Sequence, residues 1–411
     1  MEGQTKLLDL NYTYDGTGNV LSIDGESYGY NALNQLTSAS GGWGTIDYSY
    51  DAAGNMIQKV QGSTTTNYTY ASYNRLSSAG NATFTYNADG DTVKIVNGSN
   101  TSTGTYDYEN RLTSFVQNGA TVENNSYDGM GNLVYQVQGN SKTFVVFQGV
   151  NVLYSKTKKL LSSTTTGDVY ANGLHIAKLV GSSLYFYVSD ALGSTRLVTS
   201  QSGLVFSSNY LPYGPTFGQN GSEAFMYTGK PFDSLTGLYY YNARLYDPTI
   251  GRFLTEDTYT GSESDPLSLN RYTYARDNPE KYNDPNGHMF TTGSGGGSPS
   301  DTGSGANDFL TCNITGCGTV SGGTDPGSMT TGYGITNSQS CGYFGCLSNA
   351  DNAGGPQTGK IIGHSQKMGF VQYLQASYIP GHIPELVSDI VMAIMTLLGP
   401  GIVRILRQSH Y

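Results

Sequence analysis

A short aromatic motif recurs along the first third of the chain and constrains the fold more than any other feature. Each copy has an aromatic residue, one intervening residue and a tyrosine, followed by a polar turn, as in Tyr12-Thr13-Tyr14-Asp15-Gly16-Thr17-Gly18-Asn19. The marker tyrosines of the seven copies are Tyr14, Tyr30, Tyr50, Tyr70, Tyr86, Tyr108 and Tyr127. Self-similarity at a nearly constant period of about twenty residues is typical of a repeat array.

Each copy predicts one β-hairpin. The two aromatic residues stand two apart, so on a strand they share a face, and the Asp, Asn and Gly residues that follow suit a tight turn. A more aliphatic second strand comes next, for example at residues 55–60. Because a single hairpin is marginally stable, we expect the hairpins to lie side by side in one sheet. The tyrosines are then structural, packing on their neighbours with their hydroxyl groups in water.

The composition favours a thin, aromatic sheet. Of the 411 residues, 55 are Gly and 34 are Tyr, 37% are apolar and only 13% are charged, so a thick aliphatic core is not expected. The net charge of −10 makes nucleic acid an unlikely partner for residues 1–288. We predict no cofactor and no metal site.

The N-terminal residues give an expectation about location. Residues 1–10 contain no basic stretch followed by an apolar core, so no signal peptide is present, and the repeat array begins at once. We therefore expect a C-terminal piece of a longer protein that is secreted or associated with the cell surface.

The four cysteines lie in the last third of the chain, in two Cys-x4-Cys pairs: Cys312, Cys317, Cys341 and Cys346. Zinc sites usually combine closer cysteine pairs with a nearby histidine, and none is well placed here. Two disulfides are the favoured interpretation; free thiols and a metal site are the alternatives, and the pairing cannot be deduced.

The composition changes after residue 288. Residues 289–305 are rich in Gly and Ser, which is typical of a flexible linker, and residues 306–411 form a largely irregular region. Helices are expected only at residues 366–377 and 385–398, and the apolar part of the second is too short to span a bilayer.

A dense series of motifs precedes that change. They are Ser189-Asp190-Ala191-Leu192-Gly193-Ser194-Thr195-Arg196-Leu197-Val198, Tyr213-Gly214-Pro215, Tyr227-Thr228-Gly229-Lys230-Pro231-Phe232-Asp233, Thr236-Gly237-Leu238-Tyr239-Tyr240-Tyr241-Asn242-Ala243-Arg244-Leu245-Tyr246-Asp247-Pro248, Gly251-Arg252-Phe253-Leu254-Thr255-Glu256-Asp257, Asp265-Pro266-Leu267-Ser268-Leu269-Asn270-Arg271-Tyr272-Thr273-Tyr274, Asn278-Pro279 and Asp284-Pro285-Asn286-Gly287. Together with the repeats, they resemble the rearrangement hotspot (RHS), or YD-repeat, proteins over residues 10–288.

The resemblance implies a fold and a domain order. The fold is all-β: hairpin repeats at 1–184 form a curved or spiralling sheet, a fragment of an RHS shell, and the RHS core domain at 185–288 closes it. The linker at 289–305 and a variable C-terminal region at 306–411 follow. In bacterial members such a shell contains a C-terminal toxin, so residues 289–411 occupy the position of the effector.

The resemblance also implies self-cleavage just after the Asp-Pro-Asn-Gly motif, by a mechanism similar to that of aspartic proteases. By their place in the motifs, Asp257 and Asp284 would be the catalytic pair. The sequence departs from the family pattern at Glu256 and at His288, and Asp265 is an alternative to Asp257. The same Asp-Pro sequences are also ordinary turn formers.

Two other motif positions have structural interpretations. We expect Asp247 to form a turn, and we expect Arg244 and Arg252 to make ion pairs or stack on rings.

Two functions fit these observations. The first is a shell fragment that encapsulates and delivers its own C-terminal region as toxic cargo, with an immunity protein and the rest of the RHS shell as partners. Its enzymatic activity would be autoproteolysis, and the activity of the effector cannot be deduced. The second is a non-enzymatic cell-surface adhesion protein that binds carbohydrate on open tyrosine faces.

Overall fold

The computed structural model describes residues 8–171, 173–263, 265–288 and 290–292, together with the backbone of five short strands between residues 309 and 363. Within these residues the structure is almost entirely β, and its helical turns are short 3-10 segments. The strands of the large sheet are β1 (Leu8–Tyr14), β2 (Val20–Ile23), β3 (Glu26–Tyr30), β4 (Leu36–Gly41), β5 (Gly44–Tyr50), β6 (Met56–Gln61), β7 (Thr64–Tyr70), β8 (Leu76–Ala79), β9 (Ala82–Tyr86), β10 (Thr92–Asn97), β11 (Asn100–Tyr106), β12 (Leu112–Gln117), β13 (Ala120–Tyr127), β14 (Leu133–Gln138), β15 (Ser141–Gln148), β16 (Asn151–Lys158), β17 (Ser163–Ala171), β18 (Leu174–Val180), β19 (Ser183–Ser189), β20 (Thr195–Ser200), β21 (Gly203–Tyr210), β22 (Thr216–Asn220) and β33 (Gln357–Gly363). The remaining elements are β23 (Phe232–Asp233), β24 (Leu238–Tyr240), β25 (Leu245–Asp247), β26 (Arg252–Phe253), β27 (Tyr282–Asn283), β28 (Thr291–Thr292), β29 (Phe309–Asn313), β30 (Gly316–Val320), β31 (Ser340–Gly342), β32 (Gly345–Leu347), η1 (Ser72–Asn74), η2 (Tyr227–Gly229), η3 (Pro266–Leu269) and η4 (Ala275–Asp277).

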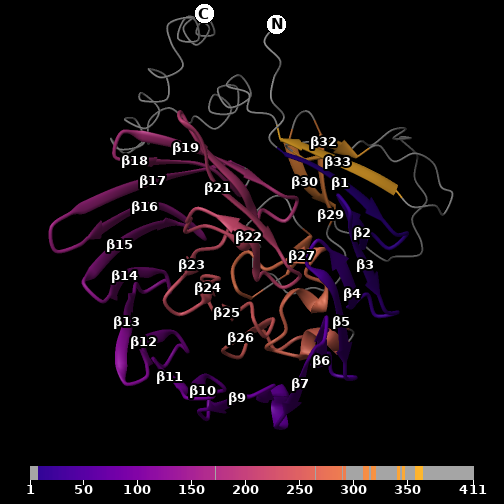
Figure 1. The fold of residues 1–411 in the computed structure, drawn as a ribbon, viewed down its shortest axis with the longest axis horizontal. Helices are drawn as coiled ribbons and strands as arrows, with labels where there is room; N and C mark the ends of the chain where they lie inside the picture. Colours follow the sequence, from indigo (N-terminus) through magenta and orange to yellow (C-terminus); the bar gives the residue numbers. More distant parts are fainter. Residues whose placement is uncertain are drawn as a thin grey trace, which may run out of the picture.

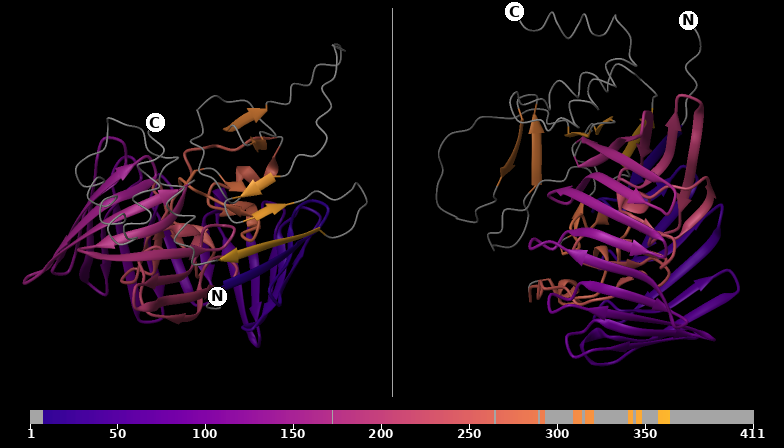
Figure 2. Two further views of the ribbon diagram at one scale, coloured as in Figure 1. Left: turned by 90° about the horizontal axis from the view of Figure 1, so that it is seen from above. Right: turned by 90° about the vertical axis from the view of Figure 1, so that its left-hand side faces the viewer.

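Strands β1 to β22 form a wall in which each strand pairs antiparallel with the next along the chain. Strand β33 adds to the outer edge of β1. The wall bends into an open arc, and residues 221–288, which we call the plug, fill its concave side (Figure 1). Figure 2 shows the hairpins of the wall stacked one beside the next. The all-β fold with a curved sheet and an enclosed core, predicted from the repeats and the family resemblance, is confirmed.

A bulge recurs next to the marker tyrosines and helps to curve the wall. In the first hairpin the pairing register shifts between Thr13 and Tyr14, and equivalent shifts precede Tyr50 and Tyr70. A bulge bends its strand and increases the local twist. Repetition of the same bulge along the wall therefore accumulates curvature in one direction.

The marker tyrosines also connect successive hairpins. The hydroxyl group of Tyr50 donates a hydrogen bond to the carbonyl of Leu36, the first residue of β4, at 2.7 Å, and Tyr70 does the same to Met56 of β6. Tyr30, Tyr106 and Tyr127 repeat the pattern. The expectation that these hydroxyls lie in water is therefore wrong, because each one satisfies a main-chain carbonyl of the preceding hairpin.

The marker of the sixth copy is Tyr106 and not Tyr108. Strand β11 ends at Tyr106, whose hydroxyl bonds to Thr92, whereas Tyr108 lies in the turn with 90% of its surface exposed. The inward position two residues before the marker is occupied by Gly104, and the ring of Tyr106 fills its space. The pair of tyrosines separated by one residue is therefore displaced here by two residues toward the C-terminus.

The core lies between the wall and the plug and is mainly aromatic. The first aromatic residues of the early repeats face inward, and Tyr28, Tyr48 and Tyr68 are buried. They meet a cluster of fully buried plug tyrosines: Tyr239, Tyr241, Tyr246, Tyr272 and Tyr274. Ring pairs in this cluster lie 4.5–6.5 Å apart, mostly tilted or edge-to-face, as aromatic quadrupoles prefer.

An early hairpin of the wall approaches its last hairpin. The ring of Trp43 lies edge-on to Phe217 at 5.9 Å, and the hydroxyls of Tyr50 and Tyr213 are 2.7 Å apart. The arc therefore wraps around the plug, although no described strand pairing closes it into a barrel.

Several predictions concern residues outside the described part of the chain. The helices expected at 366–377 and 385–398, most of the linker at 289–305 and the cysteine side chains all lie there. Among the described residues, no helix is long and apolar enough to cross a bilayer.

Candidate functional site

The plug brings three motif residues together at the point where the chain leaves it. Arg244 immediately precedes β25, Asp257 follows β26, and Asp284 follows β27. Strands β25 and β26 pair antiparallel with Tyr246 opposite Phe253. The start of β25 and the segment after β26 therefore lie at the same end of this small sheet, close to the last strand of the plug.

A single arginine joins the two predicted aspartates. The Nη2 atom of Arg244 lies 2.7 Å from Oδ2 of Asp257 and 3.1 Å from Oδ2 of Asp284. All three side chains are less than a tenth exposed. The structure therefore brings Asp257 and Asp284 together, as their place in the motifs predicts, and inserts a cation between them.

Arg244 is unusually well shielded from solvent for a charged group, with only 4% of its side chain exposed. Its guanidinium carbon stands 3.7 Å from the ring centre of Phe253, a cation–π arrangement. Burial lowers the pKa of Arg244, and the charges of Asp257 and Asp284 oppose that effect. Breaking this buried cluster on one side would leave an uncompensated charge.

Asp284 also organises the turn that ends the plug. Its Oδ1 atom accepts hydrogen bonds from the main-chain N–H groups of Gly287, at 2.8 Å, and His288, at 3.1 Å. The turn former and the charged site residue, which the sequence presents as alternative roles for this aspartate, are therefore the same group acting through its two oxygens.

Gly287 is required where it stands. Its φ of +80° is a conformation that side chains disfavour, and a Cβ atom would come within 2.4 Å of the carbonyl oxygen of Tyr241. The main chain can approach the site only because this residue is glycine. Its carbonyl oxygen accepts a hydrogen bond from Nε of Arg244.

The peptide bond between Gly287 and His288 is therefore engaged at both ends. Arg244 contacts the carbonyl, and Asp284 contacts the N–H. The His288 ring joins the cluster as well, with Nδ1 at 2.9 Å from Oδ1 of Asp257. Sequence reasoning missed His288 as a site residue, because it appeared only as a departure from the family pattern.

Glu256, the other departure, connects the site to the wall. Its carboxylate pairs with Arg75 of the wall at 3.2 Å and with Arg271 of the plug at 2.5 Å. Arg271 in turn donates from Nε to the main-chain carbonyl of Asp257. The Glu256 side chain also packs over Gly90, whose lack of a side chain permits the close approach.

The other motif residues lie apart from this cluster. Asp265, the alternative to Asp257, forms an ion pair with Arg276. Asp247 accepts hydrogen bonds from the N–H and hydroxyl of Thr249, which confirms its expected role in a turn. Arg252 stacks on the rings of Tyr70 and Tyr272, also as expected.

The last residue of each early wall turn holds the plug in place. Asn19 Oδ1 accepts a hydrogen bond from Asn278, at 2.8 Å, and Asn55 Oδ1 accepts one from Asn270, also at 2.8 Å. Between them, Gln35 donates to Asp277, at 3.0 Å. A role for this turn position was not predicted, although its recurrence as Asn or Gln in successive repeats was a usable signal.

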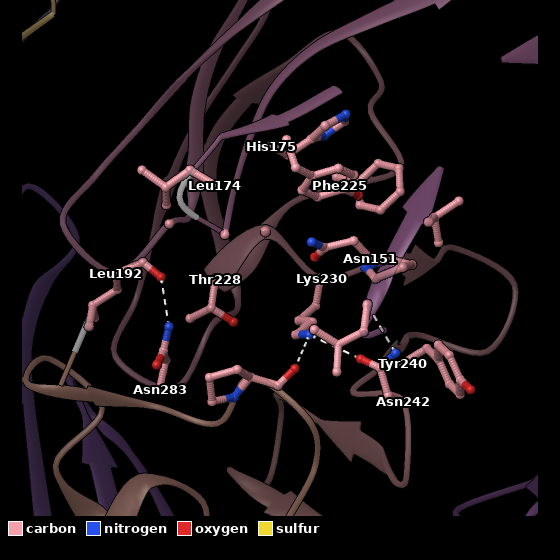
Figure 3. A pocket seen from close by; sticks show the side chains of 18 of the residues that line it. Asn151, Leu174, His175, Leu192, Phe225, Thr228, Lys230, Tyr240, Asn242 and Asn283 are labelled. Atoms are coloured by element: carbon pink, nitrogen blue, oxygen red, sulfur yellow. Dashed lines mark hydrogen bonds between the residues drawn. The ribbon is translucent and has the colours of Figure 1, made fainter. Parts of the chain in front are cut away.

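A small cavity lies beside the site, between wall and plug (Figure 3). Its volume is about 140 Å³, and His175, Phe225, Lys230, Asn242 and Asn283 are among its lining residues. The Lys230 ammonium group donates to the carbonyl of Pro285 and to Asn242 (Figure 3), and burial lowers its pKa to about 8. Lys230 thereby helps to fix the Asp-Pro-Asn-Gly turn.

The described residues offer no evident metal site. No group of three or more His, Cys, Asp or Glu side chains comes together as potential ligands anywhere in this part of the chain. The groups that the cluster brings together are two carboxylates, a guanidinium group and an imidazole.

Comparison with known proteins identifies the repeat architecture. The family description Teneurin YD-shell matches residues 3–280. Among curated proteins, salivary gland surface protein 1 of Aedes aegypti is 43% identical over 115 residues, which are 26% of this chain and 3% of that protein. The tRNA3(Ser)-specific nuclease WapA of Bacillus spizizenii is 33% identical over 172 residues, which are 39% of this chain and 7% of that protein.

A toxin component and two solved structures are also similar. Toxin subunit YenC1 of Yersinia entomophaga is 33% identical over 112 residues, 25% of this chain and 11% of that protein. The Photorhabdus luminescens Tc holotoxin pore matches 70% of this chain and 17% of its own, with a TM-score of 0.59 and 23% identity. A TcdB2–TccC3 crystal structure matches 69% and 17%, with a TM-score of 0.58 and 24% identity.

These relatives are much longer than the matched region. The chain spans between 3% and 11% of the length of these curated proteins and about a sixth of the solved chains. At such identities the solved structures show a shared fold.

Proposed function

The chain belongs to the Teneurin YD-shell family, and on that premise we propose that it is part of a toxin shell that cuts itself just after the Asp-Pro-Asn-Gly motif. Residues 289–411 are the effector, which the shell holds and then delivers. The protein is exported, and an immunity protein protects the producing cell from the effector during competition between bacteria. Two of the relatives carry nuclease or toxin-subunit names, which supports a toxin-associated role.

The observation that carries the proposal is that the site contacts both the carbonyl and the N–H group of one peptide bond, Gly287–His288. Arg244 contacts the Gly287 carbonyl, Asp284 contacts the following N–H, and Asp257 lies on the same guanidinium group. The turn itself requires only Asp284, whose Oδ1 atom accepts hydrogen bonds from main-chain N–H groups, and it does not require the buried charges of Arg244 and Asp257.

Hydrolysis requires a polarised carbonyl, an activated water and a proton for the leaving nitrogen. Arg244 polarises the Gly287 carbonyl and stabilises the negative charge that develops on its oxygen. Asp257 accepts a proton from water, whose oxygen attacks the carbonyl carbon, and that proton then passes to the His288 nitrogen, which Asp284 holds in place through its N–H group. The carbon–nitrogen bond then breaks, leaving a carboxyl group on Gly287 and an amine on His288.

Denaturing gel electrophoresis of the purified chain tests this step. We expect the 43.9 kDa chain to yield fragments of about 31 and about 13 kDa, in proportion to their lengths. Asp257→Asn and Asp284→Asn should each abolish the fragments. Asp247→Asn is the matched control, because this aspartate occupies a plug turn outside the cluster and should leave cleavage intact.

The gel separates the outcomes clearly. A single intact band from the unaltered chain would contradict self-cleavage, and cleavage that survives both asparagine variants would assign it to other residues. Mass spectrometry of the fragments identifies the bond, for which the structure favours Gly287–His288.

Growth of bacteria tests the effector. Cells that produce the whole chain should grow more slowly than cells that produce residues 1–288, and co-production of an immunity partner should restore growth. Equal growth of the two strains would count against a toxic C-terminal region.

The alternative function, adhesion through carbohydrate binding, depended on open tyrosine faces, and the structure does not show such faces in the early repeats. The rings of Tyr28, Tyr48 and Tyr68 face the plug and are 4–7% exposed, so they do not present open faces to a sugar. Carbohydrate binding is therefore not proposed.

A further inference from the structure

One segment of the wall has a charge opposite to the rest of the chain. Between Asp128 and Asp168 there is no acidic residue, although the chain as a whole has a net charge of −10. The same segment contains four lysines, namely Lys142, Lys156, Lys158 and Lys159. None of them forms an ion pair with another described residue.

The strand register places three of these lysines on the outer face of the wall. Lys142 stands opposite Lys158, and Phe144 stands opposite Lys156. Residues that alternate with Phe144 on β15, such as Val145, pack against the core, so Lys142 and Phe144 point away from it. Like charges placed directly opposite one another destabilise a strand pair. The fold gains no stability from placing Lys142 opposite Lys158, which points to a partner outside the fold.

The turn between β16 and β17 adds exposed apolar side chains to these charges. Leu160 and Leu161 are 86% and 95% exposed and occupy the two central positions of a turn closed by the N–H of Lys159 and the carbonyl of Ser162. Central turn positions favour Gly, Asn, Asp or Pro, so the local fold does not call for leucine. The hairpin extends to the left margin of the wall in Figure 1.

We propose that this segment, the basic tip (Lys142 and residues 156–161), binds an anionic lipid surface. The lysines pair with headgroup phosphates, and Leu160 and Leu161 enter the boundary between headgroups and acyl chains. Acidic residues elsewhere in the chain do not prevent this, because salt screens charges over about 8–10 Å at physiological ionic strength.

Other anionic partners explain only part of the arrangement. A nucleic acid would engage the lysines, but two leucines at the apex would face a phosphate backbone without apolar contacts. An apolar protein groove would accept the leucines but not four unpaired lysines. A membrane surface presents anionic groups above an apolar layer and so accounts for both the lysines and the leucines.

Vesicle sedimentation with the whole chain tests the proposal. Binding is expected to vesicles of phosphatidylcholine containing about one third phosphatidylglycerol, and not to phosphatidylcholine alone. Changing the four lysines to glutamine should weaken binding by about fivefold per lysine removed. The double change Leu160→Ser and Leu161→Ser should weaken it by at least about tenfold.

Two variants serve as matched controls. Lys94→Gln removes an exposed lysine from β10, and Met130→Ser removes an exposed apolar residue from a different wall turn. Both should bind as the unaltered chain does. Melting temperatures establish that every variant is folded.

Three results would overturn the proposal: no binding to the anionic vesicles, binding that the Leu160→Ser and Leu161→Ser changes leave intact, or loss of binding in the controls. Binding of duplex DNA that competes with the vesicles and is indifferent to the leucines would assign the lysines to nucleic acid instead.

Discussion

A turn of the wall and the turn that ends the plug use the same local chemistry for different ends. In the wall, Asp51 accepts two main-chain N–H groups on Oδ1, and its Oδ2 accepts the side chain of Asn55. In the plug, Asp284 again accepts main-chain N–H groups on Oδ1, but its Oδ2 faces Arg244. The two turns therefore differ in the partner of Oδ2, which is Asn55 in the structural turn and Arg244 in the candidate catalytic turn.

Function can enter a repeat fold at the second carboxylate oxygen of a turn aspartate. The first oxygen is committed to the turn by the spacing of residues in the chain, because its donors lie two to four residues away. The second oxygen is free to take a partner from anywhere. For Asp51 that partner is local and neutral, whereas for Asp284 it is a buried cation that a second aspartate shares.

The largest expected effect comes from removing that cation. Arg244→Met should lower the free energy of unfolding by about 3–5 kcal/mol, because Asp257 and Asp284 would keep buried charges without a counterion. Arg111→Met is the wall counterpart: Arg111 pairs with Asp107 inside one turn and is more exposed. Its loss should cost about 1 kcal/mol or less.

Urea denaturation measures both variants. Adding Asp257→Asn and Asp284→Asn to Arg244→Met should recover part of the loss, because the uncompensated charges disappear. Equal effects of Arg244→Met and Arg111→Met would show that the buried arginine of the plug stabilises the fold no more than the arginine of a wall turn.

The pH dependence of stability should follow the buried carboxyls. Burial raises the pKa of Glu123 to about 8, of Glu280 to about 8 and of Asp277 to about 7. By contrast, the hydrogen bond from Asn132 lowers the pKa of the wall-turn residue Asp128. Raised carboxyl pKa values stabilise the fold below the unfolded pKa, near 4, and that stabilisation is lost as the pH rises through 7–8.

We therefore expect the chain to be less stable at pH 9 than at pH 5, by about 2–3 kcal/mol. Lys230, whose pKa is lowered to about 8, opposes this trend with a single group. Thermal unfolding at the two pH values provides the measurement. The double variant Glu123→Gln and Asp277→Asn should flatten the dependence, and a protein more stable at pH 9 would contradict the prediction.

A smaller effect separates wall turns that touch the plug from those that do not. Asn55→Ala removes hydrogen bonds to Arg252 and Asn270 of the plug, at 3.2 and 2.8 Å, in addition to those in its own turn. It should cost about 2 kcal/mol. Asn132→Ala loses a side-chain hydrogen bond within its own turn and should cost about 0.5–1 kcal/mol.

Chemical denaturation ranks these two variants. If Asn132→Ala proves as costly as Asn55→Ala, the contacts with the plug contribute nothing beyond the turn itself.

The smallest effect concerns the tyrosine hydroxyls. Tyr70→Phe leaves the carbonyl of Met56 without its donor and should cost about 1 kcal/mol. Tyr73→Phe, at an exposed turn position, should change the stability by less than about 0.5 kcal/mol. Indistinguishable melting curves for the two variants would show that the hydroxyl connections between hairpins are not stabilising.

Much of the fold could be predicted because its determinants are local. Two tyrosines separated by one residue share a strand face, and an aspartate followed by glycine within a few residues forms a turn. The segment Tyr48-Ser49-Tyr50-Asp51 therefore predicts a hairpin without any information from the rest of the chain. The misassigned Tyr108 shows the limit of this reasoning: Tyr106 and Tyr108 fit the spacing equally well, and only the pairing of β11 with β12 distinguishes them.

The candidate site was predictable only in part. The family motifs pointed to Asp257 and Asp284, and the structure places both on Arg244. The contribution of His288 was not predictable, because its ring meets Asp257 across 31 positions of sequence. Glu256 is likewise tied to Arg75 across 181 positions.

By itself the sequence determined the period of the hairpins, the residues that turn between them and the aromatic faces that pack inward, since each depends on neighbours in the chain. The tertiary structure alone decided which tyrosine hydroxyl reaches which carbonyl, which carboxylate meets an arginine and which lysines gather on the outer face. These contacts join different hairpins of the wall, separate segments of the plug, or the wall and the plug, and their distances are set by the curvature that the bulged hairpins accumulate around the plug.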